Sequence, residues 1–441
     1  MRTVMPFVLF VTCSLAVAQA PEVESLTPAA GDAEVDASKV KQLVVKFDRD
    51  MNTGGMSVVG GGPAFPELDG RPQWQDARTL VIPVKLKPDH SYSLALNSHS
   101  YTNFRSKEGA VLRPVPWQFT TLPTELPPAA KQKRRNKRAL TVLLKTLEER
   151  YSYYDLNVDD WDALVKEHRE HVLAARTDRG FAAAAAKMLR ATDDLHLYLR
   201  CGEQGFATGT RSVDALYREA LLKNYVALQQ AGPRAIYGRT DDNIGYLMVG
   251  AWTADIDTDK IGAAIASMKD TKALIVDVRA NGGGDEMLAR QVAGWFVDGA
   301  KVYAKNRYRE RAGKDGFGKE LTREISGHGG DRRYEKPVVL LISPYVMSSN
   351  EAFVLMMKQA RDCLVVGQPT YGSSGNPKPF ELGNDVTVFV PSWQAMRPDG
   401  TVFEGEGIEP DEFVPCTASD LERRDPILEK ALELLRARVG E

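Results

Sequence analysis

One serine lies where a nucleophile would be useful. Ser348 stands in the stretch 344–351, between an apolar run that predicts a strand and an apolar stretch, 352–359, that predicts a helix. At such a strand-to-helix turn, backbone N–H groups point outward and the helix dipole favours developing negative charge. Ser348 followed by Glu351 is also a capping box, in which the hydroxyl only satisfies a backbone N–H. From this motif alone, Ser348 could be either a nucleophile or a helix N-cap.

A glycine run could complete such a site. The stretch 276–284 ends a second apolar run in consecutive glycines, 282–284. Glycine tolerates positive φ, so the backbone can turn its N–H groups toward an anion. The spacing matches neither the dinucleotide-binding nor the P-loop pattern, and a plain tight turn is the alternative. Two more polar loops follow in order, 367–375 and 403–411.

These four segments, taken in order, resemble the tail-specific, or carboxyl-terminal processing, serine peptidases, a family that includes the tricorn core protease. Family members carry an aspartate-arginine-asparagine-glycine strand end, a serine three residues before a glutamate, a glycine-threonine-glycine loop and an acidic glycine-isoleucine-proline-aspartate segment. The resemblance spans roughly residues 191–414. It implies Ser348 as the nucleophile, with the backbone N–H groups of Gly283 and Ser349 as the oxyanion hole.

The resemblance also bears on the base, because a serine hydroxyl must lose its proton to attack. One branch of the family uses a lysine in the glycine-threonine-glycine loop, but Ser373 occupies that position here and cannot serve as a base. Lys378 in the same loop is an alternate candidate. The tricorn-like branch uses a histidine two residues after an aspartate, and Asp194 and His196 have that spacing. This implies His196 as the general base, whose ordinary pKa of about 6.5 suits proton transfer near neutrality.

A carboxylate should orient this histidine and stabilise its cation. The resemblance implies a glutamate just before the glycine-isoleucine segment, where Glu404 and Glu406 both fit, and Glu404 is favoured. A solvated turn carboxylate is the alternative for both. The tricorn enzyme has a serine directly before its histidine, whereas Leu195 stands there in this chain. The auxiliary hydroxyl is therefore missing or comes from elsewhere.

The N-terminal part of the chain should form elements separate from this chemistry. Short alternating runs broken by turn residues predict a β-sandwich over 21–121, which resembles bacterial immunoglobulin-like domains. The stretch 122–138 contains prolines and a run of lysines and arginines, and it predicts an exposed linker.

The remaining elements must position the candidate residues. Helical periods predict a helical subdomain over 139–235, which carries His196 and includes a helix over 213–228. Apolar strands alternating with helices predict an α/β core over 236–417, and a C-terminal helix follows over 418–441. The resemblance implies that the core is of the Clp protease/crotonase-like type. Only residues 197–242, with a largely helical pattern, lie between the helical part and the core, so we expect no PDZ domain there.

The composition and the N-terminal segment indicate what broad class of protein this is. A chain of 441 residues with 43% hydrophobic and 26% charged residues is globular and multidomain, and a net charge of −2 gives no electrostatic footprint for nucleic acid. Residues 1–18 have the layout of a signal peptide, too short to span a bilayer, which predicts export to the periplasm or the exterior of a bacterial cell without a stable membrane anchor. Beyond this segment, the cysteines Cys201, Cys363 and Cys416 allow at most one disulfide.

The sequence thus predicts a secreted serine endopeptidase acting on peptides or unfolded proteins, without a cofactor or a metal. No oligomeric state is predicted. The alternative is a catalytically silent relative that binds peptides or small apolar ligands in the same cleft. The presence of Ser348, His196 and the glycine run in one chain favours the enzyme, because a binding cleft needs none of them.

Overall fold

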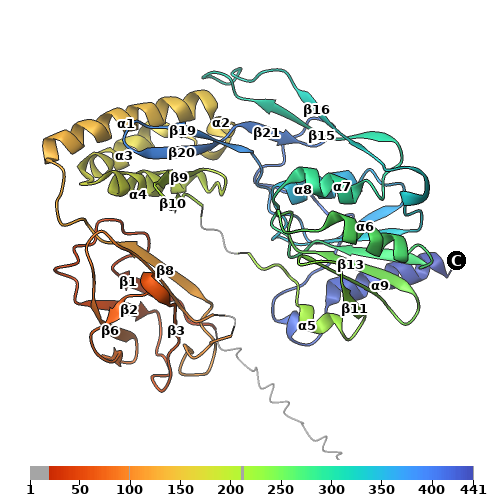
Figure 1. Cartoon of the computed structure of the whole chain (residues 1–441), viewed down its shortest axis with the longest axis horizontal. Coiled ribbons are helices and arrows are strands. Elements are labelled where there is room, and N and C mark those ends of the chain that lie inside the picture. The colour runs from red at the N-terminus through yellow and green to blue at the C-terminus, as the bar shows by residue number, and fades with distance from the viewer. Residues whose placement is uncertain (1–18, 99, 210–212, 441) are drawn as a thin grey trace, which may run out of the picture. The chain divides into compact units, whose positions relative to one another are not determined.

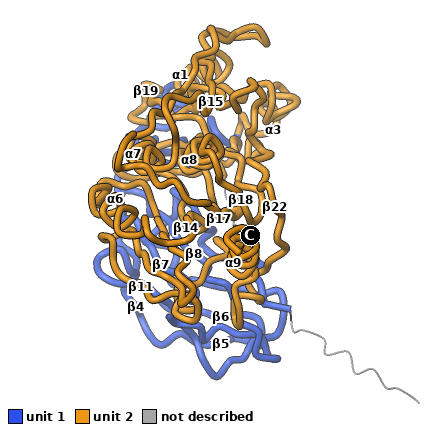
Figure 2. Tube along the Cα trace, turned by 90° about the vertical axis from the view of Figure 1, so that its right-hand side faces the viewer, with its two compact units in different colours: residues 1–136, 171–184 blue, residues 137–170, 185–441 orange. Residues whose placement is uncertain are grey.

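The computed structural model describes residues 19–98, 100–209 and 213–440 (Figure 1). The chain divides into two compact units: Met1–Asn136 with His171–Ala184, and Lys137–Glu170 with Ala185–Glu441 (Figure 2). The predicted signal peptide, 1–18, lies outside the described residues. Within the described ranges, no helix combines the length and the apolar character that a membrane span requires.

The first unit contains two antiparallel sheets around a shared core. One sheet has the order β1-β2-β6-β4, with β5 also paired to β6, and the other has the order β3-β7-β8. Alternate residues of β2, such as Val45, are buried against residues of the other sheet, such as Trp117. The strands are β1 Val23–Thr27, β2 Gln42–Phe47, β3 Val58–Val59, β4 Glu67–Leu68, β5 Gln73–Trp74, β6 Thr79–Lys85, β7 Ser91–Leu96 and β8 Val115–Thr120.

The predicted linker is partly helical. Helix α1 spans Ala129–Arg150, so the expectation of an exposed linker over 122–138 is wrong from residue 129 onward. Gln132, Asn136 and Leu140 are all buried, at the spacing of one helical face. The run of exposed cations between them hid this periodicity. The helices that follow are α2 Tyr154–Asn157, α3 Trp161–Ala174 and α4 Asp178–Leu189.

The first unit also extends beyond the predicted 21–121 module. Glu34 Oε1 accepts the backbone N–H groups of Arg176 at 2.7 Å and Thr177 at 2.9 Å, just before α4. These bonds satisfy N–H groups at the start of a helix, which have no partner within the helix itself. The segment 171–184 therefore belongs to the same compact unit as the sheets.

The predicted helical subdomain gives way to strands after α4. The expected helix over 213–228 is wrong: α5 covers only Glu219–Leu222, and β11 begins at Ala227. Residues of β11 pair with β12, so the sheet rather than a helix takes their backbone hydrogen bonds. The strands of this stretch are β9 Tyr198–Cys201, β10 Gln204–Ala207, β11 Ala227–Gln230 and β12 Ala235–Arg239.

The second unit contains two small antiparallel sheets besides the core sheet. The first has the order β10-β9-β20-β19 and the second the order β16-β15-β21. His196 lies two residues before the start of β9, so the candidate base stands at the beginning of the first small sheet. The strands not yet placed are β15 Ala300–Tyr308, β16 Leu321–Ser326, β19 Pro377–Glu381, β20 Val386–Pro391 and β21 Trp393–Met396.

The core is a sheet of the order β11-β12-β13-β14-β17-β18-β22. Pairing is parallel from β13 to β22 and antiparallel at the β11 and β12 edge. In β14, Leu274 and Val276 face one hydrophobic cluster, while Ala273 and Ile275 face another, so the strand is buried on both sides. The remaining strands are β13 Ile244–Val249, β14 Ala273–Asp277, β17 Val338–Ile342, β18 Cys363–Gly367 and β22 Glu412–Phe413.

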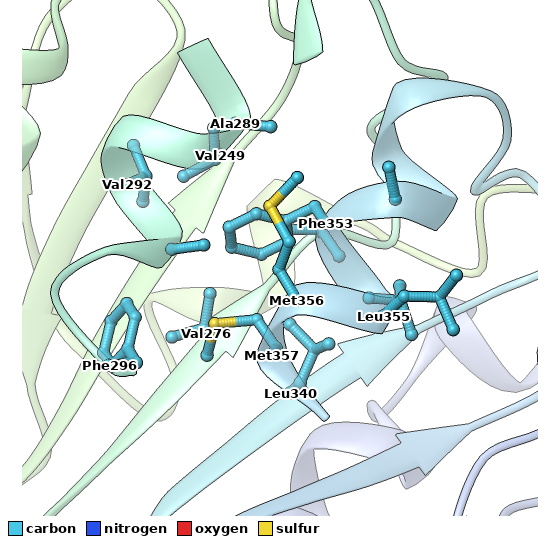
Figure 3. Packing of buried hydrophobic residues seen from close by; sticks show 14 of the residues in the cluster. Val249, Val276, Ala289, Val292, Phe296, Leu340, Phe353, Leu355, Met356 and Met357 are labelled. Atoms are coloured by element: carbon cyan, nitrogen blue, oxygen red, sulfur yellow. The ribbon is translucent and has the colours of Figure 1, made fainter. Parts of the chain in front are cut away.

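Helices cover both faces of this sheet. Residues of α6 (Thr258–Ser267), α7 (Glu286–Ala293) and α8 (Ser349–Met357) pack on one face, and residues of α9 (Pro426–Val439) pack on the other. Figure 3 shows Phe353 and Met357 of α8 lying among side chains of β14, β17 and α7. Every residue of α8 is buried, so the N-terminus of this helix is held rigidly in the core.

Candidate active site

Ser348 occupies a strained turn between β17 and α8. Its φ of 57° and ψ of −130° place a non-glycine residue in a sparsely populated conformation, which costs about 1–3 kcal/mol. The backbone N–H of Ser348 donates to Ser373 O at 2.8 Å and to Glu351 Oε2 at 3.2 Å. These bonds hold the turn in place.

His196 lies against the Ser348 hydroxyl. Its Nε2 is 3.1 Å from Ser348 Oγ, and its Nδ1 is 2.9 Å from Ser373 Oγ. Burial lowers the pKa of His196 below its ordinary value, and the charge of Asp194 partly opposes this shift. The imidazole is therefore neutral at neutral pH and able to accept a proton.

Ser373 joins the two candidate residues, although the sequence assigns it no part in proton transfer. It is 2% exposed. Its hydroxyl meets His196, its carbonyl accepts the Ser348 N–H, and its own N–H donates to Glu351 Oε2 at 3.2 Å. A hydroxyl cannot replace the lysine of the other family branch as a base, but it can orient an imidazole. This supplies the auxiliary hydroxyl that Leu195 does not.

Glu404 does not make the predicted contact with His196. Its Oε2 accepts the backbone N–H of Ser374 at 2.9 Å, while Ser373 occupies His196 Nδ1. A turn that starts at Glu404 explains this placement, because Gly405 N–H donates to Gly372 O and holds the glutamate beside Ser374.

Glu406, the alternate orienting carboxylate, and Lys378, the alternate base, also lie away from His196. Both nitrogens of its imidazole face serine hydroxyls, those of Ser348 and Ser373. Glu406 is exposed, with its carboxylate 3.8 Å from Arg397. Lys378 is exposed on β19, opposite Val390 of β20.

Two acidic residues with buried carboxyl groups, Asp194 and Glu404, lie near His196. Asp194 is 1% exposed; its Oδ1 accepts the backbone N–H of His196 at 2.8 Å, and its Oδ2 accepts the hydroxyl of Tyr151 at 2.8 Å. Burial raises the pKa of Asp194, and interaction with His196 opposes that shift. For Glu404, burial is again the main cause and the charge of Asp194 the second, and together they raise its pKa well above the ordinary value.

Glu351 ties the nucleophile turn to the loop that carries Ser373. It is fully buried, and its carboxylate accepts Thr370 Oγ1 at 2.6 Å and Gly372 N at 2.8 Å, besides the N–H groups of Ser348 and Ser373. Burial raises the pKa of Glu351 to about 7, although these donors oppose the shift. The capping box predicted its bond to Ser348 but not its bonds to the loop.

The glycine run lies directly against Ser348. Gly283 has a φ of 110°, and a Cβ there would stand 2.9 Å from Met347 O and 3.0 Å from Ser348 Cβ, so only glycine fits. Its N–H donates to Asn281 Oδ1 at 2.9 Å. The structure thus brings the predicted oxyanion residues Gly283 and Ser349 to the nucleophile, with one of the two N–H groups already bonded.

Two buried asparagines fix this loop: Asn281, the asparagine of the strand-end motif, and Asn350, to which the sequence assigns no role. Asn350 Nδ2 donates to Asn281 O at 2.9 Å, and Asn350 Oδ1 accepts the indole N–H of Trp252 at 3.0 Å. Both asparagines are fully buried. Asn350 lies two residues after Ser348, and that proximity is the only signal in the sequence that could have indicated it.

A buried ion cluster anchors the strand that leads into the glycines. Arg279 is fully buried and pairs with Asp277 at 2.7 Å and with Asp425, the N-cap of α9, at 2.8 Å. The hydroxyl of Tyr246 donates to the Asp277 carboxylate at 2.8 Å. The arginine of the strand-end motif therefore links β14 to α9.

Within the residues that the structure describes, no group of three or more His, Cys, Asp or Glu side chains could hold a metal ion. Cys363 and Cys416 are free thiols, so no disulfide joins either of them to another cysteine.

Comparisons with known proteins agree with this geometry. Residues 243–414 match the model of Peptidase family S41. The carboxy-terminal processing protease CtpA of Bacillus subtilis is 25% identical over 174 residues, which cover 38% of this chain and 34% of that protein. This chain therefore matches about a third of the length of that relative. Residues 243–414 are therefore similar to peptidase family S41, whose members are serine-type peptidases.

Two solved structures resemble this chain in fold. A structure from Parabacteroides merdae, described as that of a candidate peptidase, aligns with a TM-score of 0.60 and 26% identity over 68% of this chain and 96% of that chain. The structure of mature CPAF aligns with a TM-score of 0.53 and 13% identity over 69% of this chain and 97% of that chain. At 13% identity, the likeness to CPAF concerns the fold alone.

Proposed function

We propose that this chain is an exported serine endopeptidase that cleaves peptides or unfolded proteins through an acyl-enzyme at Ser348, with His196 as the general base. The observation that carries the proposal is the 3.1 Å approach of His196 Nε2 to Ser348 Oγ, with Nδ1 held at 2.9 Å by Ser373. A histidine held at both nitrogens between two serine hydroxyls is placed for proton transfer.

The proposed reaction begins with His196 protonated on Nδ1, which donates to Ser373 Oγ. As Ser348 Oγ attacks the substrate carbonyl carbon, its proton passes to His196 Nε2, and the carbonyl electron pair moves to oxygen. The tetrahedral intermediate then collapses, the C–N bond breaks, and Nε2 returns the proton to the leaving amine. Water repeats the sequence on the acyl ester and releases the acid product and free Ser348.

The negative oxygen needs donors while the intermediate exists. We assign this role to the N–H of Ser349, the first residue of α8, and to the N–H of Gly283. In the resting structure the Gly283 N–H donates to Asn281 at 2.9 Å, so it must leave Asn281 to serve the oxyanion. This engaged donor is the one observation that favours the alternative function, a silent relative that binds peptides or small apolar ligands.

The experiment that separates the two functions uses a fluorophosphonate probe and unfolded casein. The wild-type chain should be labelled at Ser348 and should cleave casein, and Ser348→Ala should lose both properties while keeping its fold, because losing an N-cap costs only about 1 kcal/mol. Ser326→Ala, at an exposed position on β16, is the control for an unrelated serine. An unlabelled, folded wild-type chain would favour the binding function.

The other modules complete the proposal. We take the two-sheet part of the first unit as an immunoglobulin-like spacer or adhesive module, and the seven-stranded sheet with its helices as a Clp protease/crotonase-like core. The signal-peptide layout of 1–18 supports export, and the peptidase chemistry proposed above needs neither a metal nor a cofactor.

A further inference from the structure

We infer that Asp194 is the ionised carboxylate that supports His196, and that Glu404 beside it carries a proton. The two acids would form a pair with one charged and one neutral member. The neutral member would be Glu404, which the sequence favours as the residue that orients His196. This inference rests on the proposed function of His196 as a base, and it names a positioning residue that acts through His196 rather than on the substrate.

The donors around Asp194 favour its charged form. One carboxylate oxygen accepts the His196 N–H and the other accepts the Tyr151 hydroxyl, each at 2.8 Å. Tyr151 is itself fixed, because Asn157 Nδ2 donates to its hydroxyl at 2.9 Å. A carboxylate that accepts a bond on each oxygen is stabilised as an anion.

Glu404 has less support for a charge. The backbone N–H of Ser374 donates to one of its oxygens at 2.9 Å. The Tyr153 hydroxyl also interacts with Glu404, but it donates its single proton to Ser374 O at 2.7 Å. The charges of Asp194 and Glu351 both oppose ionisation of Glu404. Two carboxyl groups buried beside each other share protons as a pair, and the one with fewer donors keeps the proton.

The other titratable groups around the pair do not change this balance. Burial raises the pKa of the tyrosines that face it, Tyr151 and Tyr153, so both stay neutral. The guanidinium of Arg323 interacts with Tyr153 but is paired with the carboxylate of Glu286. His196 is the positive partner when it takes the proton from Ser348, and its Coulombic partner is Asp194.

The charge of Asp194 therefore stabilises the imidazolium that forms in the reaction. The carboxylate of Asp194 accepts the backbone N–H of His196 and does not contact the ring. Asp194 could therefore act only by holding the backbone of His196 in place, or it could also stabilise the charged imidazolium. The pH dependence of the imidazole separates them, because a structural role would leave the titration of His196 in place.

The test compares Asp194→Asn with Glu404→Gln, two substitutions that each replace a carboxyl group by an amide of the same shape. For Asp194→Asn we expect kcat/KM to fall by about tenfold or more, with the acidic limb moved to lower pH by about one unit, because the imidazolium loses its countercharge. For Glu404→Gln we expect kcat/KM within about threefold of wild type and an unmoved limb, because the amide imitates a protonated acid. Thermal unfolding confirms that both variants are folded.

Two readouts do not need turnover, so they separate this inference from the proposed function. The NMR titration of the His196 ring should move to lower pH in Asp194→Asn and stay in place in Glu404→Gln. In infrared difference spectra, the C=O band of a protonated carboxylic acid should disappear in Glu404→Gln. The opposite pattern, with Glu404→Gln moving the titration and Asp194→Asn leaving it, would overturn the inference. An inactive wild-type chain that shows the expected spectra would instead sink the proposed function alone.

Discussion

Replacing Ser373 by alanine tests how the base is held. The substitution removes the hydroxyl that lies 2.9 Å from His196 Nδ1 and leaves the backbone bonds from Ser373 to Ser348 and Glu351 in place. The imidazole then loses the partner that fixes its tautomer and its orientation. The loss should therefore appear in the rate rather than in substrate binding.

The size of the effect follows from the kind of hydrogen bond. In the proposed reaction His196 becomes positively charged, and a hydrogen bond to a charged group contributes about 1.5–3 kcal/mol. This corresponds to a fall in kcat of about 10- to 150-fold. The acidic limb of the kcat/KM profile, already below 6.5 because burial lowers the pKa of His196, should move to lower pH, since the cation has lost an acceptor.

The assay measures kcat, KM and their pH dependence on a peptide substrate, beside thermal unfolding. Ser374→Ala is the control, because its bonds to Glu404 and Tyr153 come from the backbone and survive the change. We expect this control within about threefold of wild type, as its side chain has no assigned role. If Ser373→Ala keeps the wild-type rate and an unmoved limb, the orienting role is refuted.

Three further substitutions test the framework of the site. Arg279→Met should lower the free energy of unfolding by about 3–5 kcal/mol in urea denaturation, because it leaves Asp277 and Asp425 buried without a cation. Gly283→Ala should lose most activity while a folded protein remains in circular dichroism, because a Cβ would press on the Ser348 turn and strain a positive φ by about 1–3 kcal/mol. Glu351→Gln should lower stability in thermal unfolding by about 1–3 kcal/mol and lower activity, because an amide N–H₂ would face backbone donors; unchanged stability would show that these bonds contribute nothing.

The sequence led to the proposed nucleophile and the proposed base because both stand in short local patterns. Ser348 lies in a serine–glutamate motif between apolar runs, and His196 follows an aspartate by two residues. The structure brings them within hydrogen-bond distance across 152 positions of the chain. The fold of the core was predictable for a related reason, since strands buried on both faces, such as β14, are nearly all apolar.

The partners of the base could not be predicted in the same way. Which side chain meets His196 Nδ1 depends on how the loop 370–376 folds, and that depends on the bonds from Glu351 to Thr370 and Gly372. Such bonds join segments that are distant along the chain, and they produce no periodic pattern of residues from which they could be predicted. The misplaced helix over 213–228 has a similar cause, because pairing of β11 with β12 decided its structure.

The link from Arg279 to Asp425 also bears on the time at which the site can form during synthesis. Domains fold as the chain leaves the ribosome, N-terminal parts first. Arg279 meets its second carboxylate only 146 positions later, at the start of α9. Until that helix has been made, the strand leading into the glycine run lacks one of its two anchors, although Ser348 and His196 have already emerged. The proposed site should therefore be completed only after α9 has been synthesised, later than Ser348 and His196 themselves.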